Sequence, residues 1–192
     1  MNEPRKCAGD GVRSGRTSGP REFVAAAYDR FADGLYRYAV MILADRADAE
    51  DAVQQAFAKV VRMGERAKKI QSCGDYLRTA VRNECWRMIE GRRRYPERMG
   101  MSPPAPMLEA AASRGLDEDE RLQIEAAVRA LPPEQREVVH LKVYEGKTFQ
   151  EIADWLGTSI NTVASRYRYA MDKLHHLLTC PGDFEGYSHE RR

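Results

Sequence analysis

The side chains best suited to chemistry lie toward the C-terminal end of the chain, where amide, hydroxyl and guanidinium groups gather. They take the outward positions of a helix expected over residues 160–173, and they are Asn161, Thr162, Ser165, Arg166, Arg168, Tyr169 and Lys173. Such groups form hydrogen bonds to base edges and to phosphates. The pattern therefore predicts a DNA-binding surface, and the alternative is an ordinary helical hairpin with a polar face.

A second candidate surface lies in a basic stretch of the first half of the chain. Residues 59–98 contain twelve Lys/Arg and five Asp/Glu, a net charge of +7. Arginines and aromatic residues are interleaved there: the arginines are Arg78, Arg82, Arg87, Arg92, Arg93 and Arg94, and the aromatic residues are Tyr76, Trp86 and Tyr95. Cations bind phosphates, and exposed aromatic rings stack on unpaired bases. The alternative interpretation is a buried Trp86 beside solvated arginines.

The remaining composition argues against other classes of protein. We find no nucleophile–base group and no Gly-rich phosphate loop, so we expect neither an enzyme nor a bound cofactor. The four cysteines are scattered, and we expect reduced thiols. His175, His176 and Cys180 lie close together, but no second pair of ligands accompanies them, so we expect no metal. Without a secretory signal or an apolar run of ~20 residues, a cytoplasmic protein is expected.

Helical periodicity positions the basic stretch. Apolar residues recur at spacings of three and four from Phe23 to Leu43, which predicts a first helix. A second helix is expected to begin at Asp48, whose carboxylate can cap free backbone amides. Its apolar stripe is Ala49, Ala52, Val53, Ala56, Phe57 and Val60.

A third helix follows a polar loop expected over residues 64–71. It is predicted from about Asp75 to Arg93, with Ser72 as the acceptor at its cap. Its buried stripe is Leu77, Val81, Cys85 and Met88. The segment MGMSPPAP (99–106) then excludes a regular helix, because proline fixes the backbone and removes a donor. We interpret it as a linker that divides the chain into two helical domains.

The second half is predicted to be helical throughout. An acidic helix over 117–130 ends before Pro132-Pro133, where another helix begins and carries Val138, Val139, Leu141 and Val143 to about Gly146. Thr148 to Glu151 fits a capping box, and Gly157 ends the short helix that follows.

The helix after Gly157 is expected to bury Ile160, Val163, Tyr167, Ala170, Met171 and Leu174. Two helices joined by a tight glycine-containing turn form a helix-turn-helix, whose second helix enters a DNA major groove. The expected fold is all-α, with two small helical domains, a Pro-containing linker, a C-terminal helix-turn-helix and no sheet.

Four stretches carry a resemblance to a known family. They are YDRFADGLYRYA (28–39), DAEDAVQQAFAKVV (48–61), YLRTAVRNECW (76–86) and LPPEQREVVHLKVYEGKTFQEIADWLGTSINTVASRYRYAMDKL (131–174). In this order, on both sides of a proline-containing linker, they resemble the extracytoplasmic-function (ECF) group of bacterial RNA polymerase sigma factors, in the sigma-70 family. The resemblance covers residues 22–95 and 120–178, about two thirds of the chain.

The resemblance implies a division of the chain by role. A disordered basic tail (1–21) precedes a region 2 domain (22–95), which binds core polymerase and recognises and melts the minus-10 element. A linker (96–118), a region 4 helix-turn-helix for the minus-35 element (119–178) and a C-terminal tail (179–192) follow.

The resemblance also implies roles for single residues. Contact with the clamp helices of the largest polymerase subunit falls to Asp48, Asp51, Gln54, Gln55 and Phe57, although the family commonly has Glu where this chain has Gln55. Asn83 takes the position beside a flipped-out base, whose capture offsets the cost of unpairing. The family often has Arg where this chain has Ala164, so contacts there fall to Ser165, Arg166, Arg168 or Tyr169.

The predicted function is that of a sigma factor that binds RNA polymerase core and promoter DNA. A net charge of only +2 favours weak DNA binding by the free chain, which suits action within a complex. We expect a monomer when free, and an anti-sigma factor is a further candidate partner from the resemblance. The alternative is a stand-alone helix-turn-helix regulator, which would bind a palindromic site without polymerase.

Overall fold

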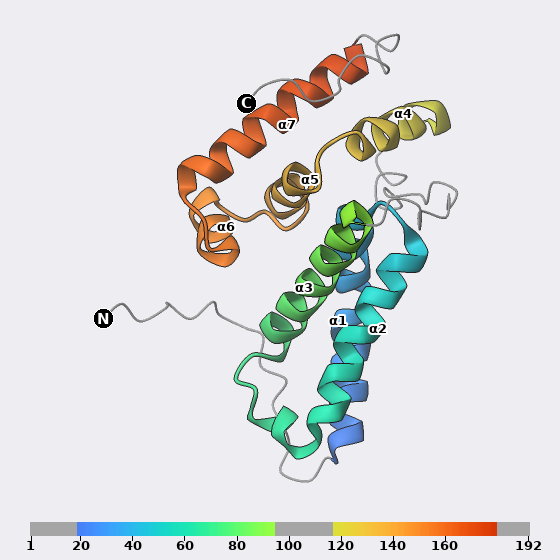
Figure 1. Cartoon of the computed structure of the whole chain (residues 1–192), viewed down its shortest axis with the longest axis vertical. Coiled ribbons are helices and arrows are strands. Elements are labelled where there is room, and N and C mark those ends of the chain that lie inside the picture. Colours follow the sequence, from blue (N-terminus) through green and yellow to red (C-terminus); the bar gives the residue numbers. More distant parts are fainter. Residues whose placement is uncertain (1–18, 95–116, 180–192) are drawn as a thin grey trace. The chain divides into compact units, whose positions relative to one another are not determined.

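The structure is a computed structural model that describes residues 19–94 and 117–179. The chain divides into two compact units, Met1–Pro103 and Pro104–Arg192, each with its own helices (Figure 1). Every regular element in the two described segments is helical, as the sequence predicts, and neither segment contains a strand. The predicted MGMSPPAP linker lies outside the described residues.

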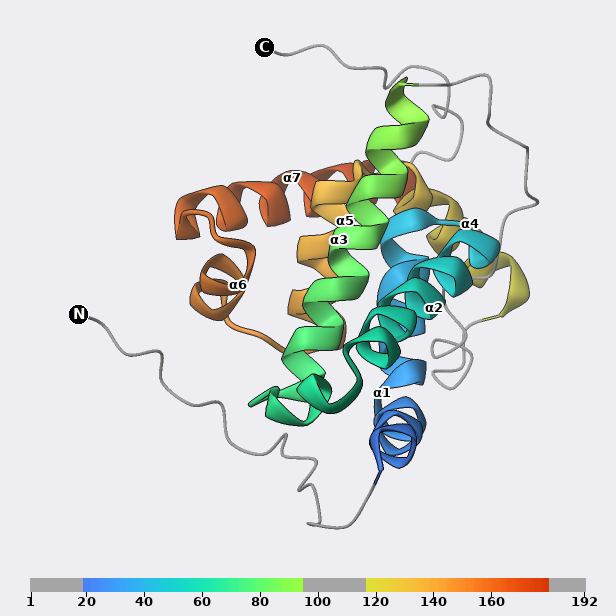
Figure 2. The ribbon, with the colours of Figure 1, turned by 60° about the horizontal axis from the view of Figure 1, so that its bottom comes forward.

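Unit 1 is a three-helix bundle with one short 3-10 helix. Its elements are α1 (Pro20–Leu43), α2 (Arg46–Met63), η1 (Gly64–Lys69) and α3 (Cys73–Arg94). Each of the three long helices packs against the other two, and both ribbon views show them side by side (Figures 1 and 2). The bundle therefore has one core, to which every helix contributes a stripe.

The core of unit 1 follows the predicted periodicity closely. The buried residues of α2 are Ala49, Ala52, Val53, Ala56, Phe57 and Val60, which confirms the expected stripe. On α3 the prediction holds for Leu77, Val81 and Cys85, but Met88 is only partly buried and Ile89 takes the buried position. Ile89 lies four residues after Cys85, so it continues the row on which that side chain lies.

The ends of the helices depart from the prediction in two places. Asp45, rather than Asp48, caps α2, since its carboxylate accepts the Asp48 amide at 3.0 Å. The expected loop over 64–71 contains η1, which buries Ala67 completely. At the start of α3 the prediction is confirmed, because the Asp75 amide donates to Ser72 Oγ at 3.3 Å.

Unit 2 contains four α-helices and a π-helical segment in its described part. They are α4 (Glu118–Arg129), α5 (Pro133–Val139), η4 (His140–Tyr144, the π-helical segment), α6 (Phe149–Leu156) and α7 (Ile160–Thr179). Asp117 and Glu120 form a capping box at α4, so this helix begins inside the range expected for the linker.

The core of unit 2 joins α5 to α7. Leu131, Val139 and Ala170 form a buried cluster, and the partly buried side chains against it are Tyr167, Met171 and Leu174. Two expected core residues are exposed instead: Val143 is 50% exposed and Ile160 is 43% exposed. Val143 lies in η4, where wider i→i+5 turns change the direction of successive side chains, and Ile160 is the first residue of α7. None of the described helices is long and apolar enough to cross a membrane.

Candidate nucleic-acid interface

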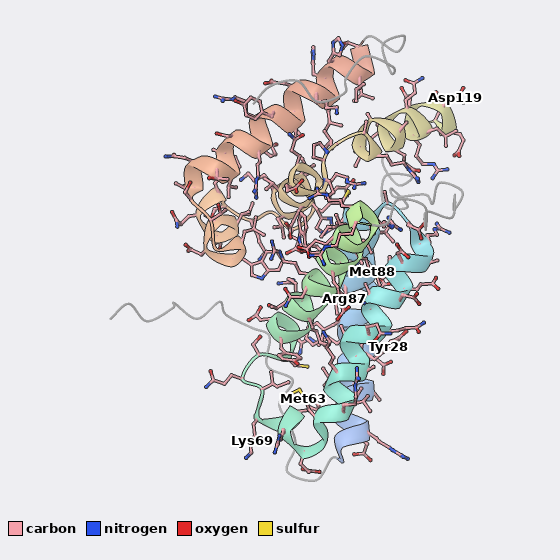
Figure 3. All side chains as sticks on the ribbon, in the orientation of Figure 1. Tyr28, Met63, Lys69, Arg87, Met88 and Asp119 are labelled. Carbon is pink, nitrogen blue, oxygen red and sulfur yellow. The ribbon has the colours of Figure 1, made fainter. Side chains whose placement is uncertain are left out.

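The polar surface of α3 carries the candidate side chains of unit 1. Asn83 and Arg87 are exposed, while the partly buried members are Tyr76, Arg78, Arg82 and Trp86. Residues four apart on a helix lie on the same face, so Asn83 and Arg87 are neighbours one turn apart. The structure thus brings an amide and a guanidinium together on one accessible face, with Arg87 in the second half of α3 (Figure 3).

Trp86 falls between the two interpretations of its role. Its ring is partly buried, and its indole Nε1 is enclosed without a hydrogen-bond partner in the structure. The Arg82 guanidinium lies 5.8 Å from the centre of the same ring, within the range of a cation–π contact. Arg82 and Trp86 therefore form one mixed cationic and aromatic surface on α3.

A buried carboxylate organises the centre of α3. Glu84 is 5% exposed and accepts hydrogen bonds from Lys59 Nζ at 2.5 Å and from Arg87 Nε at 2.7 Å. Burial alone would raise the pKa of Glu84, but the hydrogen bonds and charges of Lys59 and Arg87 outweigh it and hold the pKa below its ordinary value. Glu84 is therefore ionised at neutral pH and carries a charge matched by two cations.

The end of α3 is fastened to the start of α2 by Arg92. Its guanidinium forms an ion pair with Asp48, lies 3.8 Å from Asp45 and donates to the Leu43 carbonyl at 3.5 Å. We refer to these four residues as the Arg92 clasp. Arg92 belongs to the basic stretch expected to meet DNA, and Asp48 to the set expected to meet polymerase, but here they bind each other.

The remaining expected polymerase contacts divide by exposure. Asp51, Gln54 and Gln55 are exposed on α2, whereas Phe57 is buried with its ring centre 5.0 Å from that of Tyr28. Phe57 thus packs in the core, where it holds α2 against α1. Of the five expected polymerase contacts, these three polar residues are thus the ones that α2 fully exposes to a partner.

A groove beside this surface had no counterpart in the sequence analysis. It lies between α1 and α2, has a volume of about 650 Å³, and is lined by Tyr28, Asp29, Ala32, Asp33, Tyr36, Glu50, Val53 and Gln54. The lining residues come from two separate helices and meet only when those helices pack. No pattern within either helix could therefore have predicted the groove.

In unit 2, caps fix where both helices of the helix-turn-helix begin. Thr148 and Glu151 form the predicted capping box, and the hydrogen bond from the Thr148 amide to the Glu151 carboxylate measures 2.8 Å. This bond, with a second from the Thr148 hydroxyl, holds the pKa of Glu151 below its ordinary value. At α7 the Thr162 amide donates to Ser159 Oγ at 3.0 Å.

The turn between α6 and α7 has the geometry that the sequence predicts. Gly157 ends α6 with a φ of +65°, in the left-handed region that favours glycine. Both ribbon views show α6 meeting the start of α7 at this short turn (Figures 1 and 2). Phe149 and Tyr167 pack with ring centres 5.4 Å apart, which joins the two helices.

The candidate residues of α7 are not equally available. Asn161, Arg168 and Tyr169 are exposed, and the partly exposed members are Thr162, Ser165 and Arg166. Lys173 donates to the Ala130 carbonyl at 2.9 Å, at the end of α4, and burial lowers its pKa. Lys173 thus fastens α4 to α7, so the surface suited to DNA is the N-terminal part of α7.

Comparison with known proteins shows the family to which this arrangement belongs. Residues 27–95 match Sigma-70 region 2, and residues 121–174 match Sigma-70, region 4. The chain is 30% identical over 168 residues to the ECF RNA polymerase sigma factor SigL of Mycobacterium tuberculosis, covering 84% of this chain and 92% of that protein. The chain belongs to the ECF sigma-factor family.

Other relatives agree with this assignment. The RNA polymerase sigma-E factor of Streptomyces coelicolor is 31% identical over 145 residues, 74% of this chain and 78% of that one. The sigma factor RpoE of Bartonella quintana, solved in complex with the anti-sigma factor NepR, shares the fold with a TM-score of 0.60 and 22% identity. That alignment covers 83% of this chain and 96% of RpoE.

Membership of the ECF family confirms the predicted fold class and excludes the stand-alone regulator. The matched regions lie on either side of the undescribed segment, one in each compact unit. ECF sigma factors are non-catalytic initiation factors. Within the described segments, no group of three or more His, Cys, Asp or Glu side chains could hold a metal ion.

Proposed function

We propose that this sigma factor directs promoter-specific transcription initiation by joining RNA polymerase core and holding two separate DNA elements. The observation that supports this most directly is the presence in one chain of both matched regions, each with an accessible polar helix face. Because the units share one chain, binding of the first element makes binding of the second effectively intramolecular.

Region 2 is proposed to extend over residues 22–95 and to contribute two functional surfaces. The first is the exposed polar face of α2, which would contact the polymerase through Asp51, Gln54 and Gln55. The second is the surface of α3, which would recognise and open the minus-10 element. On that surface Asn83 would lie beside a flipped-out base, with Arg87 close to a phosphate of the unpaired strand.

Region 4 is proposed to extend over residues 119–178 and to bind the minus-35 element with α7. The proposal rests on the caps that fix the start of α7 and on the polar groups exposed in its first turns. Asn161, Ser165 and Arg166 would reach base edges or phosphates, with Arg168 and Tyr169 beside the groove. Residues 96–118 would then be the linker between the two regions.

Membership of the ECF family also bears on the oligomeric state, location and partners of the free protein. We infer that the protein is a monomer when free, acts in the cytoplasm and needs no cofactor. The solved sigma factor RpoE of Bartonella quintana is in complex with the anti-sigma factor NepR. An anti-sigma factor is therefore a candidate partner of this chain.

Run-off transcription tests the proposed function. Purified protein, core polymerase and a pool of genomic promoter fragments should yield transcripts that share two sequence elements at a fixed separation. Core polymerase alone serves as the control and should yield no such set. The proposal would be refuted if the protein failed to associate with core at micromolar concentration but protected a symmetric DNA site by itself.

A further inference from the structure

Glu84 joins the helix that faces polymerase to the helix proposed to meet DNA. Its two carboxylate oxygens take different partners: Lys59 Nζ on α2 donates to Oε1, and Arg87 Nε on α3 donates to Oε2. A buried carboxylate is costly unless charge and hydrogen bonds compensate it, and both compensations are present here. The side chain is therefore fixed in place by groups on two helices.

The bond to Glu84 leaves Arg87 able to bind something else. The side chain of Arg87 is 65% exposed although its Nε donates to a buried carboxylate. The bond therefore restrains the guanidinium at Nε and leaves its outer end exposed. A guanidinium carries five N–H donors; one terminal N–H lies parallel to the Nε–H, and the other three point in other directions and stay available. Since Asn83 lies one turn earlier on the same face, these donors lie close to the proposed base-capture position.

Lys59 makes the arrangement compatible with an approaching phosphate. A lone carboxylate beside Arg87 would cancel its positive charge and leave no net attraction for a phosphate. With Lys59 within 2.5 Å of the same carboxylate, the three side chains together carry a net charge of +1. The cluster thus stays attractive to an anion while the guanidinium is held still.

We propose that Glu84 is a positioning residue for promoter opening. Anchored to α2 through Lys59, it holds Arg87 beside Asn83, where the guanidinium can bind a backbone phosphate of the unpaired strand. This inference rests on the proposed role of α3 at the minus-10 element. It assigns a function to a buried side chain that is only 5% exposed.

A double-mutant cycle on promoter opening tests the proposal. Opening is followed by the fluorescence of 2-aminopurine in the minus-10 element, using holoenzyme assembled with full-length protein. Glu84→Gln and Arg87→Ala should each slow opening about tenfold, the factor that accompanies loss of one pre-ordered side chain. The double variant should be no slower than either single one, because Glu84 acts only through Arg87. Additive losses would overturn the proposal.

A charge swap separates positioning from folding. Lys59→Glu combined with Glu84→Lys restores an ion pair between α2 and α3, but it places a cation against Arg87. Because the swap keeps the α2–α3 pair but loses the Arg87 bond, we expect a free energy of unfolding near that of Glu84→Gln, and opening as slow as in that variant. Recovery of opening in the swap would show that Glu84 serves only the fold and would overturn the proposal.

The proposed function itself is controlled separately. If holoenzyme with the original chain failed to assemble or to open any promoter, the role of α3 would be refuted before the variants were compared. If it opened DNA normally and Arg87→Ala had no effect, the proposed function would stand and the positioning role would be refuted.

Discussion

The Arg92 clasp yields a prediction that separates a structural role for Asp48 from a role in binding polymerase. Replacing Arg92 by Met keeps much of the aliphatic stem but removes the guanidinium that contacts Asp48, Asp45 and the Leu43 carbonyl. We expect this change to destabilise unit 1, because the end of α3 loses its attachment to the start of α2.

The expected loss follows from the exposure of the pair. The side chains of Arg92 and Asp48 are 34% and 30% exposed, between a surface pair and a buried one. Hydrogen bonds to charged groups contribute about 1.5–3 kcal/mol, whereas fully exposed pairs contribute ~0–1 kcal/mol. Arg92→Met should therefore cost about 2 kcal/mol, and the coupling between Arg92 and Asp48 should be about 1 kcal/mol. For a domain of this size the melting temperature should fall by about 10 °C.

Tryptophan fluorescence measures this loss in unit 1 alone. The chain has two tryptophans, Trp86 in unit 1 and Trp155 in unit 2, so Trp155→Phe leaves Trp86 as the reporter. Denaturant unfolding in that background should be compared for Arg92→Met, Asp48→Asn and the double variant. Arg94→Met is the matched control, because Arg94 is exposed and lies two residues further along α3. Its replacement should change the free energy of unfolding by less than about 0.5 kcal/mol.

Two results would refute this reasoning. One is a loss of unfolding free energy in Arg94→Met as large as that in Arg92→Met, because it would mean that any lost positive charge at the end of α3 destabilises unit 1. The other is Asp48→Asn with unchanged stability but weakened affinity for core polymerase. That combination would return Asp48 to the polymerase contact that the family resemblance implies.

Three further predictions concern the DNA-binding helix, a turn and a buried charge. Arg166→Ala should weaken binding of holoenzyme to a minus-35 fragment about tenfold and leave binding to a premelted minus-10 fragment unchanged, as measured by fluorescence anisotropy; equal losses on both would contradict its place on α7. Gly157→Ala should destabilise unit 2 by about 1 kcal/mol, because Gly157 has a positive φ. Gly34→Ala should instead stabilise unit 1 by about 0.5–1 kcal/mol, because Gly34 lies inside α1 with open space around a new Cβ. Thermal melts in which both variants change stability in the same direction would refute this backbone argument. The pKa of Glu84 lies below its ordinary value of 4.5, so its stabilising contribution is present above pH 4.5 and is lost as the pH falls through the lower pKa of the folded state. The free energy of unfolding of unit 1 should therefore drop in that acidic range. An equal drop in Glu84→Gln would show that another group is responsible.

The features predicted well from the sequence are those encoded within one turn or one helix. The capping box of Thr148 and Glu151, the glycine turn at Gly157 and the apolar stripe of α2 all depend on neighbours within a few residues. Periodicity also predicts which face of α3 is buried. Such features need no knowledge of how helices pack, and this is why the fold class and the helix-turn-helix follow from the sequence.

The features that escaped prediction depend on packing between distant segments. Arg92 meets Asp48 across 44 residues of sequence, and Glu84 meets Lys59 across 25. Periodicity places each of them on a face but does not say which charged side chain lies opposite. The exposure of Val143 has a different cause, since a single wide turn in η4 shifts the direction of side chains without any visible signal in the sequence.

The pairing of cations inside unit 1 also affects how the free protein responds to salt. Of the basic side chains in the 59–98 stretch, Lys59 and Arg92 each lie against a carboxylate and have no proposed contact with DNA. Only cations that neutralise phosphates release condensed counterions, so these two contribute less to the ionic-strength dependence of DNA binding than a count of charges implies. A chain built this way is held on DNA less by its overall basicity than by the few groups that remain turned toward the duplex.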